Sequence, residues 1–172
     1  MTRLSTTAML FATAIVLSAC QSGDESEAPK KVAAPVVLVA PASENDDAWK
    51  AYLQKVVGQH MEGVSDRIYP YYLPANSSVP TPGDLENKSQ YDRQLSNVTN
   101  VVTRTVLPGN MLVFGSPDSA KMADLVVAAF TGAKVDALRG SQVLFIGKTA
   151  DSDRVKAAAE AIGARYIFVE AK

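Results

Sequence analysis

The sequence contains one cysteine and one histidine among its 172 residues, and its 17 lysines and arginines are almost balanced by 18 acidic residues. One cysteine excludes an intramolecular disulfide, and together with one histidine it falls short of the roughly four ligands of a structural zinc site. A formal charge of −1 provides no basic surface for nucleic acid phosphates. These scarcities exclude disulfide-stapled domains, zinc-stabilised domains and nucleic-acid-binding proteins.

The chain also opens on an apolar run that is too short to cross a membrane. The run covers Ala8 to Ala19 and follows the positive Arg3. A helix needs roughly 20 apolar residues to span a bilayer. The length of the run, its basic flank and the small residues at its end are typical of an export signal peptide. The chain as a whole is 47% hydrophobic, which suits an ordinary folded domain.

The run ends in Leu17, Ser18, Ala19 and Cys20. These residues resemble the lipobox of bacterial prolipoproteins, in which a leucine and two small residues precede the cysteine that becomes the first mature residue. The resemblance implies cleavage after Ala19, a diacylglyceryl thioether on Cys20 and usually an amide-linked acyl chain such as palmitate. Two or three acyl chains anchor a protein stably, at roughly 0.8 kcal/mol per buried methylene. We therefore expect a lipoprotein that is held on the membrane.

The residue after the cysteine bears on whether the protein is delivered to the inner or the outer membrane. In the enteric lipoproteins that this N-terminus resembles, the absence of aspartate at that position leaves the protein free to reach the outer membrane. Gln21 occupies the position here. The resemblance therefore favours the periplasmic face of the outer membrane over the inner membrane.

The sequence divides into three parts: a signal peptide at 1–19, the lipidated cysteine with a flexible tether at 20–45, and one folded domain at 46–172. The tether is rich in charged, small and proline residues, so it buries too little apolar area to offset the entropy of ordering it. Val36 to Val39 stand out as four apolar residues. They are either a short edge strand or a merely apolar part of the tether.

Two helices are expected ahead of the main strands. The first follows a cap at Asn45 or Asp46 and a stop at Gly63, and its apolar stripe is Trp49, Tyr52, Leu53, Val56, Val57, His60 and Met61. The second ends before Pro108, and its stripe is Tyr91, Leu95, Val98, Val102 and Thr105. The β-branched residues in its second half leave a strand open there.

Three apolar runs predict buried strands: Met111–Phe114, Val143–Ile146 and Tyr166–Val169. They lack apolar and polar alternation, which suits a sheet covered on both faces. Helical patterns separate them, with stops at Gly132 and Gly163. We therefore predict an α/β fold: a three-layer α/β/α domain with a small, mostly parallel sheet, whose three C-terminal strands follow βαβαβ order and are preceded by two helices.

In an open α/β sheet, ligands usually bind beyond the carboxyl ends of the strands. Ser116, Asp118 and Asp151 are expected at this edge, where they suit helix caps and complement helix dipoles. Lys148 is a candidate contact for an acidic ligand, or else a solvated side chain. A P-loop is excluded because Gln142 stands where its first glycine is needed. The sequence thus predicts no cofactor.

Catalytic and metal-binding residues are not predicted. His60 is the only imidazole, and its place on the apolar stripe of the first helix favours packing over catalysis. No pair of carboxylates stands out as glycosidase chemistry would need.

Tyr69, Tyr71 and Tyr72 are stronger candidates for a binding surface than His60 or the carboxylates are for catalysis. They fall in the proline-rich stretch from Val64 to Asn87, which predicts a loop. Tyrosines on a rigid loop supply amphipathic contact area for a glycan, peptide or protein. The alternative is that they pack over the helical layer.

The leading hypothesis is a lipid-anchored cell-envelope protein with a noncatalytic periplasmic module that binds an envelope protein or a glycan. The alternative is a small periplasmic hydrolase that uses Lys148, Asp118 or Asp151 at the carboxyl edge of the sheet. A concave pocket with converging polar groups at that edge would favour the hydrolase. A groove or patch near the three tyrosines would favour the binding module.

Overall fold

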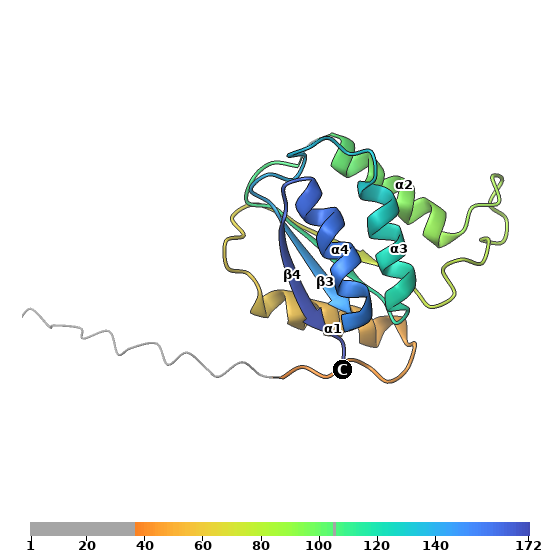
Figure 1. Ribbon diagram of the computed structural model, residues 1–172. Coiled ribbons are helices and arrows are strands. Elements are labelled where there is room, and N and C mark those ends of the chain that lie inside the picture. Colours follow the sequence, from red (N-terminus) through yellow and green to blue (C-terminus); the bar gives the residue numbers. More distant parts are fainter. Residues whose placement is uncertain (1–36, 105) are drawn as a thin grey trace, which may run out of the picture. The chain divides into compact units, whose positions relative to one another are not determined.

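The computed structural model describes residues 37–104 and 106–172 (Figure 1). The expected signal peptide, Cys20 and most of the expected tether lie outside these residues. Helices and strands alternate in the order α1 (Asp46–Gln59), β1 (Ile68–Tyr72), α2 (Gln90–Thr103), β2 (Met111–Gly115), α3 (Ser119–Phe130), β3 (Gln142–Gly147), α4 (Thr149–Ala161) and β4 (Arg165–Glu170). No helix in the described ranges has the length and apolar character to cross a membrane.

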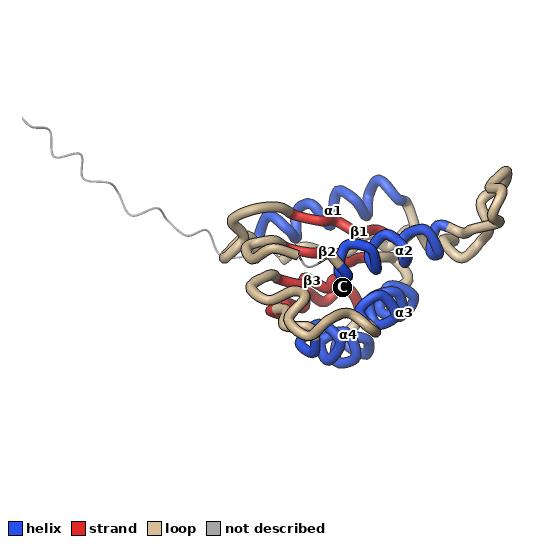
Figure 2. The backbone as a smooth tube through the Cα atoms, turned by 90° about the horizontal axis from the view of Figure 1, so that it is seen from above, coloured by secondary structure: helices blue, strands red, loops and turns tan. Residues whose placement is uncertain are grey.

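The four strands form one sheet in the order β1-β2-β3-β4, and every pair is parallel. Each neighbouring pair is joined through one helix, and such crossovers share one hand. The three crossover helices α2, α3 and α4 therefore cover the same face of the sheet, and α1 covers the other. Figure 2 shows α1 on one side of the strands and α3 and α4 on the opposite side.

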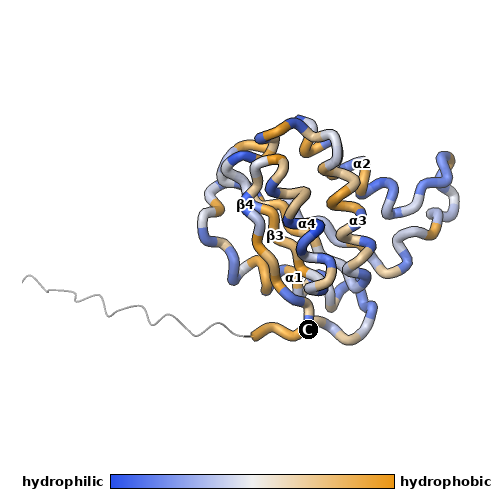
Figure 3. The backbone as a smooth tube through the Cα atoms, viewed as in Figure 1, coloured by the Kyte–Doolittle hydropathy of each residue, from blue (hydrophilic) through white to orange (hydrophobic). Residues whose placement is uncertain are grey.

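Each face of the sheet carries its own hydrophobic core. Phe114 and Phe145 lie in the core beneath α2, α3 and α4, while Val113 and Leu144 lie in the core beneath α1. Successive residues of β2 and β3 thus enter opposite cores, which explains their unbroken apolar runs. Hydrophobic residues follow the strands, and the loop between β1 and α2 is mostly hydrophilic (Figure 3).

The α/β class and the parallel C-terminal strands are confirmed, but two details of the predicted layout are wrong. The sheet has four strands rather than three, because Ile68–Tyr72 forms β1 where a loop was predicted. The two early helices do not both precede the sheet. α2 connects β1 to β2 and packs beside α3, so it belongs to the layer of crossover helices.

The helix ends follow from local chemistry. The Asn45 side chain accepts a hydrogen bond from the Ala48 N–H and caps α1, as predicted. α1 ends at Gln59, before the expected stop at Gly63, so His60 is a C-terminal cap and not part of an apolar stripe. The helix over Gln90–Thr103 and the stops just after α3 and α4 are confirmed.

The folded domain includes part of the stretch assigned to the tether. The Ala40 N–H donates to the Lys172 carbonyl at 2.7 Å, and the Trp49 indole N–H donates to the Ser43 carbonyl at 3.0 Å. Leu38 and Ala40 pack against the core beneath α1. Residues 37–40 are not assigned to a strand. Ordered structure therefore begins before the predicted boundary at residue 46.

Candidate functional site

The carboxyl edge of the sheet holds a buried serine and carboxylate pair. The Ser119 hydroxyl, at the start of α3, donates to the Asp151 carboxylate at 2.7 Å and accepts the Lys148 backbone N–H at 2.8 Å. Asp151 lies in the first turn of α4. The serine therefore ties the beginning of α3 to the beginning of α4.

Arg154 closes this network from the solvent side. Its guanidinium donates to Asp151 at 2.8 Å and to the Ala120 carbonyl at 2.8 Å, and it also pairs with Asp124. Burial opposes ionisation of Asp151, but the hydrogen bonds from Ser119 and Arg154 outweigh it, so the pKa of Asp151 lies below its usual value. Asp151 is therefore a weaker base than an ordinary aspartate, and its carboxylate is engaged by two donors.

The side chains of Asp118 and Ser116, next to this pair, also make hydrogen bonds to the backbone at the ends of the strands and of α3. The Asp118 carboxylate accepts the Lys121 N–H at 3.0 Å and caps α3. The Ser116 hydroxyl donates to the Leu73 carbonyl at 2.8 Å and accepts the Asp118 N–H at 3.0 Å. The capping role expected for Asp118 is confirmed, whereas Ser116 links the ends of β1 and β2 instead of capping the helix.

Two hollows of about 330 and 290 Å³ adjoin this edge, and Pro117, Ser119 and Lys148 line both. Lys148 is exposed at their rim. His60, the only imidazole of the chain, is the C-terminal cap of α1, at the opposite end of that helix from Asp46, and its Nδ1 lies 2.8 Å from the Val56 carbonyl oxygen. The strand order never reverses, so the sheet has no switch point at which a ligand crevice would open. The two carboxylates at this edge, Asp118 and Asp151, both accept hydrogen bonds from the first turn of α3.

No group of three histidine, cysteine, aspartate or glutamate side chains within 37–104 and 106–172 is placed to hold a metal ion.

The three tyrosines do not form one surface. They belong to β1, so they alternate between faces: Tyr69 and Tyr71 point to the helices α2 to α4, and Tyr72 points to α1. Tyr71 is 5% exposed and stacks on Phe114 with ring centroids 5.0 Å apart. Burial and the nearby Tyr69 raise the pKa of Tyr71 to about 12. Tyr71 is a core residue and cannot contact a partner.

Tyr72 lines an apolar groove between α1 and β1. The groove has a volume of about 460 Å³ and is bounded by Lys50, Leu53, Gln54, Val57, Ile68, Pro70, Tyr72 and Val113. The Tyr72 hydroxyl donates to the Asp46 carboxylate at 2.9 Å, and Lys50 Nζ lies 5.7 Å from the centre of its ring. Burial and this hydrogen bond raise the pKa of Tyr72. The ring is therefore held rigidly as one wall of the groove. We call this feature the α1–β1 groove.

Sequence reasoning found only Tyr72 among the groove residues. The sequence pattern places Leu53 and Val57 on the apolar stripe of the first helix and predicts a loop at Pro70. The missed signal is the alternation of Ile68, Pro70 and Tyr72, which places all three on one face of an extended strand. Lys148 does not line this groove, and Tyr69 lines another hollow of about 400 Å³ near Arg104. The exposed or half-buried candidate binding residues of the sequence therefore fall at three separate places.

Comparison with known protein families, curated proteins and solved structures finds no match for this chain.

Proposed function

We propose that the chain is a lipid-anchored protein of the cell envelope whose folded domain is a noncatalytic binding module. The lipobox-like Leu17-Ser18-Ala19-Cys20 supports the anchor, and Gln21 supports delivery to the periplasmic face of the outer membrane. The α1–β1 groove is the observation that carries the binding role. The hydrolase alternative is disfavoured because Ser119 is bonded to a weakly basic carboxylate and no imidazole is near.

The lining of the α1–β1 groove defines the kind of ligand that fits. Leu53, Val57, Ile68 and Pro70 present hydrocarbon, and burying such surface contributes about 25 cal/mol per Å². Tyr72 adds a flat ring whose orientation is fixed by Asp46, so little side-chain entropy is lost on binding. We therefore assign the groove to a segment of another envelope protein that inserts an apolar side chain.

The membrane anchor is tested by fractionation of the full-length protein and of Cys20→Ala. The parent is expected wholly in the membrane fraction, and the variant in the soluble periplasmic fraction. Acyl chains on the parent would be read by mass spectrometry of its N-terminal peptide. A variant that stayed wholly with the membrane would refute the lipid anchor.

The binding role is tested by a photo-reactive side chain at Gln54, which is exposed and lines the α1–β1 groove. Cross-linking in intact cells is expected to give one discrete protein adduct, identified by mass spectrometry. Lys156 on α4 is the matched control, because it is exposed on the opposite face. Adducts of equal yield at both positions would contradict a specific groove, and an adduct with glycan strands would replace the protein partner.

A further inference from the structure

The connections at the amino ends of the four strands form one continuous surface, which we call the amino edge. It comprises residues 60–67, 104, 106–110, 131–141 and 162–165. The Ser65 N–H donates to the Gly109 carbonyl at 3.0 Å, and the Gly109 N–H donates to the Gly140 carbonyl at 2.8 Å. The Leu138 N–H donates to the Ile162 carbonyl at 2.9 Å. Because these bonds join all four connections, the side chains of the amino edge belong to one surface.

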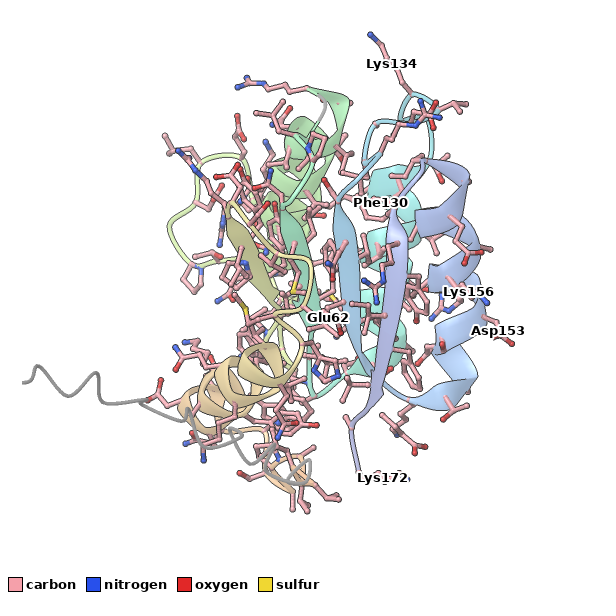
Figure 4. The ribbon with its side chains drawn as sticks, turned by 90° about the vertical axis from the view of Figure 1, so that its left-hand side faces the viewer. Glu62, Phe130, Lys134, Asp153, Lys156 and Lys172 are labelled. Atoms are coloured by element: carbon pink, nitrogen blue, oxygen red, sulfur yellow. The ribbon has the colours of Figure 1, made fainter. Side chains whose placement is uncertain are left out.

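Positive charge gathers on the amino edge. It carries five exposed basic side chains and three exposed acidic ones, namely Arg67, Arg104, Lys134, Arg139 and Arg165 against Glu62, Asp66 and Asp136. This excess of two positive charges lies in a chain of formal charge −1. At the opposite edge, the first turns of α1, α2 and α4 hold acidic residues. Figure 4 shows Lys134 projecting from one end of the folded domain and Lys172 at the other end.

The cations of the amino edge have weak partners or none. Three of them make no ion pair within 37–104 and 106–172: Arg104, Lys134 and Arg165. The Nε atom of Arg67 lies 3.9 Å from the Asp66 carboxylate, and the Nε atom of Arg139 lies 3.6 Å from the Asp136 carboxylate. Both distances are longer than a hydrogen bond. These charged groups are therefore available to an anion outside the domain.

Two large apolar side chains are exposed on the same edge. Leu107 is 67% exposed and Val135 is 79% exposed. Their loops lie side by side, since the Val106 N–H donates to the Ala137 carbonyl at 3.0 Å. A surface that combines exposed apolar side chains with cations suits a bilayer, because the apolar groups enter the interface while the cations attract anionic headgroups.

The connection between β1 and α2 also exposes apolar side chains, but its charge is different. Val79 and Leu85 are 62% and 103% exposed there. The same connection holds Asp84 and Glu86 against Lys88 alone, so its net charge is unfavourable beside an anionic membrane. The amino edge is therefore the surface of this domain that combines exposed apolar groups with excess positive charge.

A hollow of about 400 Å³ in the amino edge is lined by Arg67 and Arg104. Tyr69, Leu107 and Asp66 line it as well. Guanidinium groups make strong, charge-assisted hydrogen bonds to phosphate, and tyrosine rings are common at the depth of lipid headgroups. The hollow thus offers two cationic donors and an apolar wall to one phospholipid headgroup.

We propose that the amino edge lies on a bilayer that contains anionic phospholipid, with Leu107 and Val135 in the interface and a lipid phosphate beside Arg67 and Arg104. The proposal rests on the proposed lipid anchor for proximity: an anchored domain meets the bilayer at high effective concentration, so a modest excess of charge is sufficient.

The length of the chain permits this orientation. Val37 is near the carboxyl edge of the sheet, since the Ala40 N–H donates to the Lys172 carbonyl. The chain from Cys20 to Val37 can reach at most roughly 60 Å, whereas strands of this length span about 20 Å. An anchor at Cys20 is therefore compatible with contact between the amino edge and the membrane.

Fluorescent labels on the full-length, lipidated protein in vesicles test the contact. Leu107→Cys and Val135→Cys each carry an environment-sensitive fluorophore, and Val79→Cys is the matched control in an exposed valine position away from the amino edge. Vesicles contain phosphatidylcholine alone or with phosphatidylglycerol. The first two labels are expected to brighten and shift to the blue only with phosphatidylglycerol, and the label at position 79 is expected to stay unchanged. The unlabelled parent shows that an acylated Cys20 does not react.

The outcomes separate the amino edge from the anchor. Flotation of the parent with phosphatidylcholine vesicles reports on the anchor, and failure to float would count against the anchor alone. Labels at 107 and 135 that stay unchanged on protein that floats with anionic vesicles would overturn the proposal. An equal change at position 79, or an equal change without anionic lipid, would also overturn it. Shielding in native membranes but in neither kind of vesicle would assign the edge to another envelope macromolecule.

Charge reversal supplies a second measurement on the protein labelled at position 135. Each basic residue near an anionic surface contributes a factor of about five to binding, so Arg104→Glu/Lys134→Glu is expected to lower the ratio of docked to undocked domain about 25-fold or more. Lys88→Glu/Lys172→Glu is the matched control, because both lysines are exposed away from the amino edge. Equal signals from the two double variants, at equal melting temperature, would refute the role of the positive edge.

Discussion

Tyr71 and Tyr72 are adjacent in the sequence, yet the structure predicts opposite consequences for their removal. Tyr71 is 5% exposed and stacked on Phe114, so Tyr71→Ala leaves a large void in the core and is expected to cost about 3–5 kcal/mol. Tyr72→Ala removes a half-buried ring and one hydrogen bond to Asp46, at roughly 1–2 kcal/mol. The two variants should therefore differ by roughly 1–4 kcal/mol.

Two assays separate stability from binding. Urea unfolding followed by circular dichroism gives the free energy of unfolding, and each kcal/mol corresponds to a shift in melting temperature on the order of 3–5 °C for a domain of this size. Cross-linking from Gln54 reports on the α1–β1 groove. Tyr72→Ala is expected to abolish the cross-linked adduct while the domain stays folded. Tyr71→Ala is expected to lower the free energy of unfolding. At a temperature where the Tyr71→Ala domain is still folded, its adduct yield should equal that of the parent.

The loss of stability at alkaline pH provides a further check on the role of Tyr72. The pKa of Tyr72 is raised in the folded state, so the unfolded chain ionises first and stability is lost as the pH rises above about 10. Tyr72→Phe should therefore show a smaller loss of stability between pH 9 and roughly 11 than the parent. A cost of Tyr71→Ala no larger than that of Tyr72→Ala, or a full cross-link in Tyr72→Ala, would contradict the different roles of the two rings.

Further predictions concern the core and the carboxyl edge. The buried Tyr52 hydroxyl has no hydrogen-bond partner among the described residues, so Tyr52→Phe should raise the free energy of unfolding by about 1 kcal/mol in urea titrations. Asp151→Asn should cost about 1–3 kcal/mol at pH 7. The pKa of Asp151 is lowered on folding, so the difference in free energy of unfolding between the parent and Asp151→Asn should shrink as the pH falls below 3.8. A difference in melting temperature that did not change with pH would contradict the network with Arg154. Gly147→Ala would place a Cβ 2.5 Å from the Ser119 hydroxyl and should destabilise the domain by about 1–3 kcal/mol in the same titrations, whereas an unchanged midpoint would contradict the close approach.

Strand β1 shows why part of the fold could not be predicted from the sequence. A proline inside a short run argues against a strand, because it removes a donor from the ladder. In this sheet the Met111 N–H donates to the Arg67 carbonyl, and the Leu73 N–H donates to the Gly115 carbonyl, so the odd-numbered residues of β1 bond β2. Pro70 is even-numbered and faces outward, where its missing N–H costs no ladder bond. That position on the edge is set by the tertiary pairing and is not visible in the local pattern.

The strands β2, β3 and β4 and their helices were predictable because both faces of the sheet are covered. Buried parallel strands read as continuous apolar runs, and the glycines after α3 and α4 mark helix ends. The candidate site was less predictable. His60 and Met61 continue the apolar spacing of α1, but the helix ends at Gln59. Periodicity alone therefore predicted a helix that is too long at its C-terminal end. Periodicity also could not show that Tyr71 and Tyr72 would face different cores.

The α1–β1 groove has a physical cause in the way one helix covers this face of the sheet. A helix is about 10–12 Å wide and neighbouring strands are about 4.8 Å apart, so one helix covers about two strands. On this face α1 stands alone, and it buries Val113 of β2 and Leu144 of β3 completely. The corresponding residues of the outer strands, Ile68 and Ile167, are only half-buried. Among the described residues, the less covered surface of this face therefore lies on both sides of α1: at Ile68, where it forms the groove beside β1, and at Ile167 of β4.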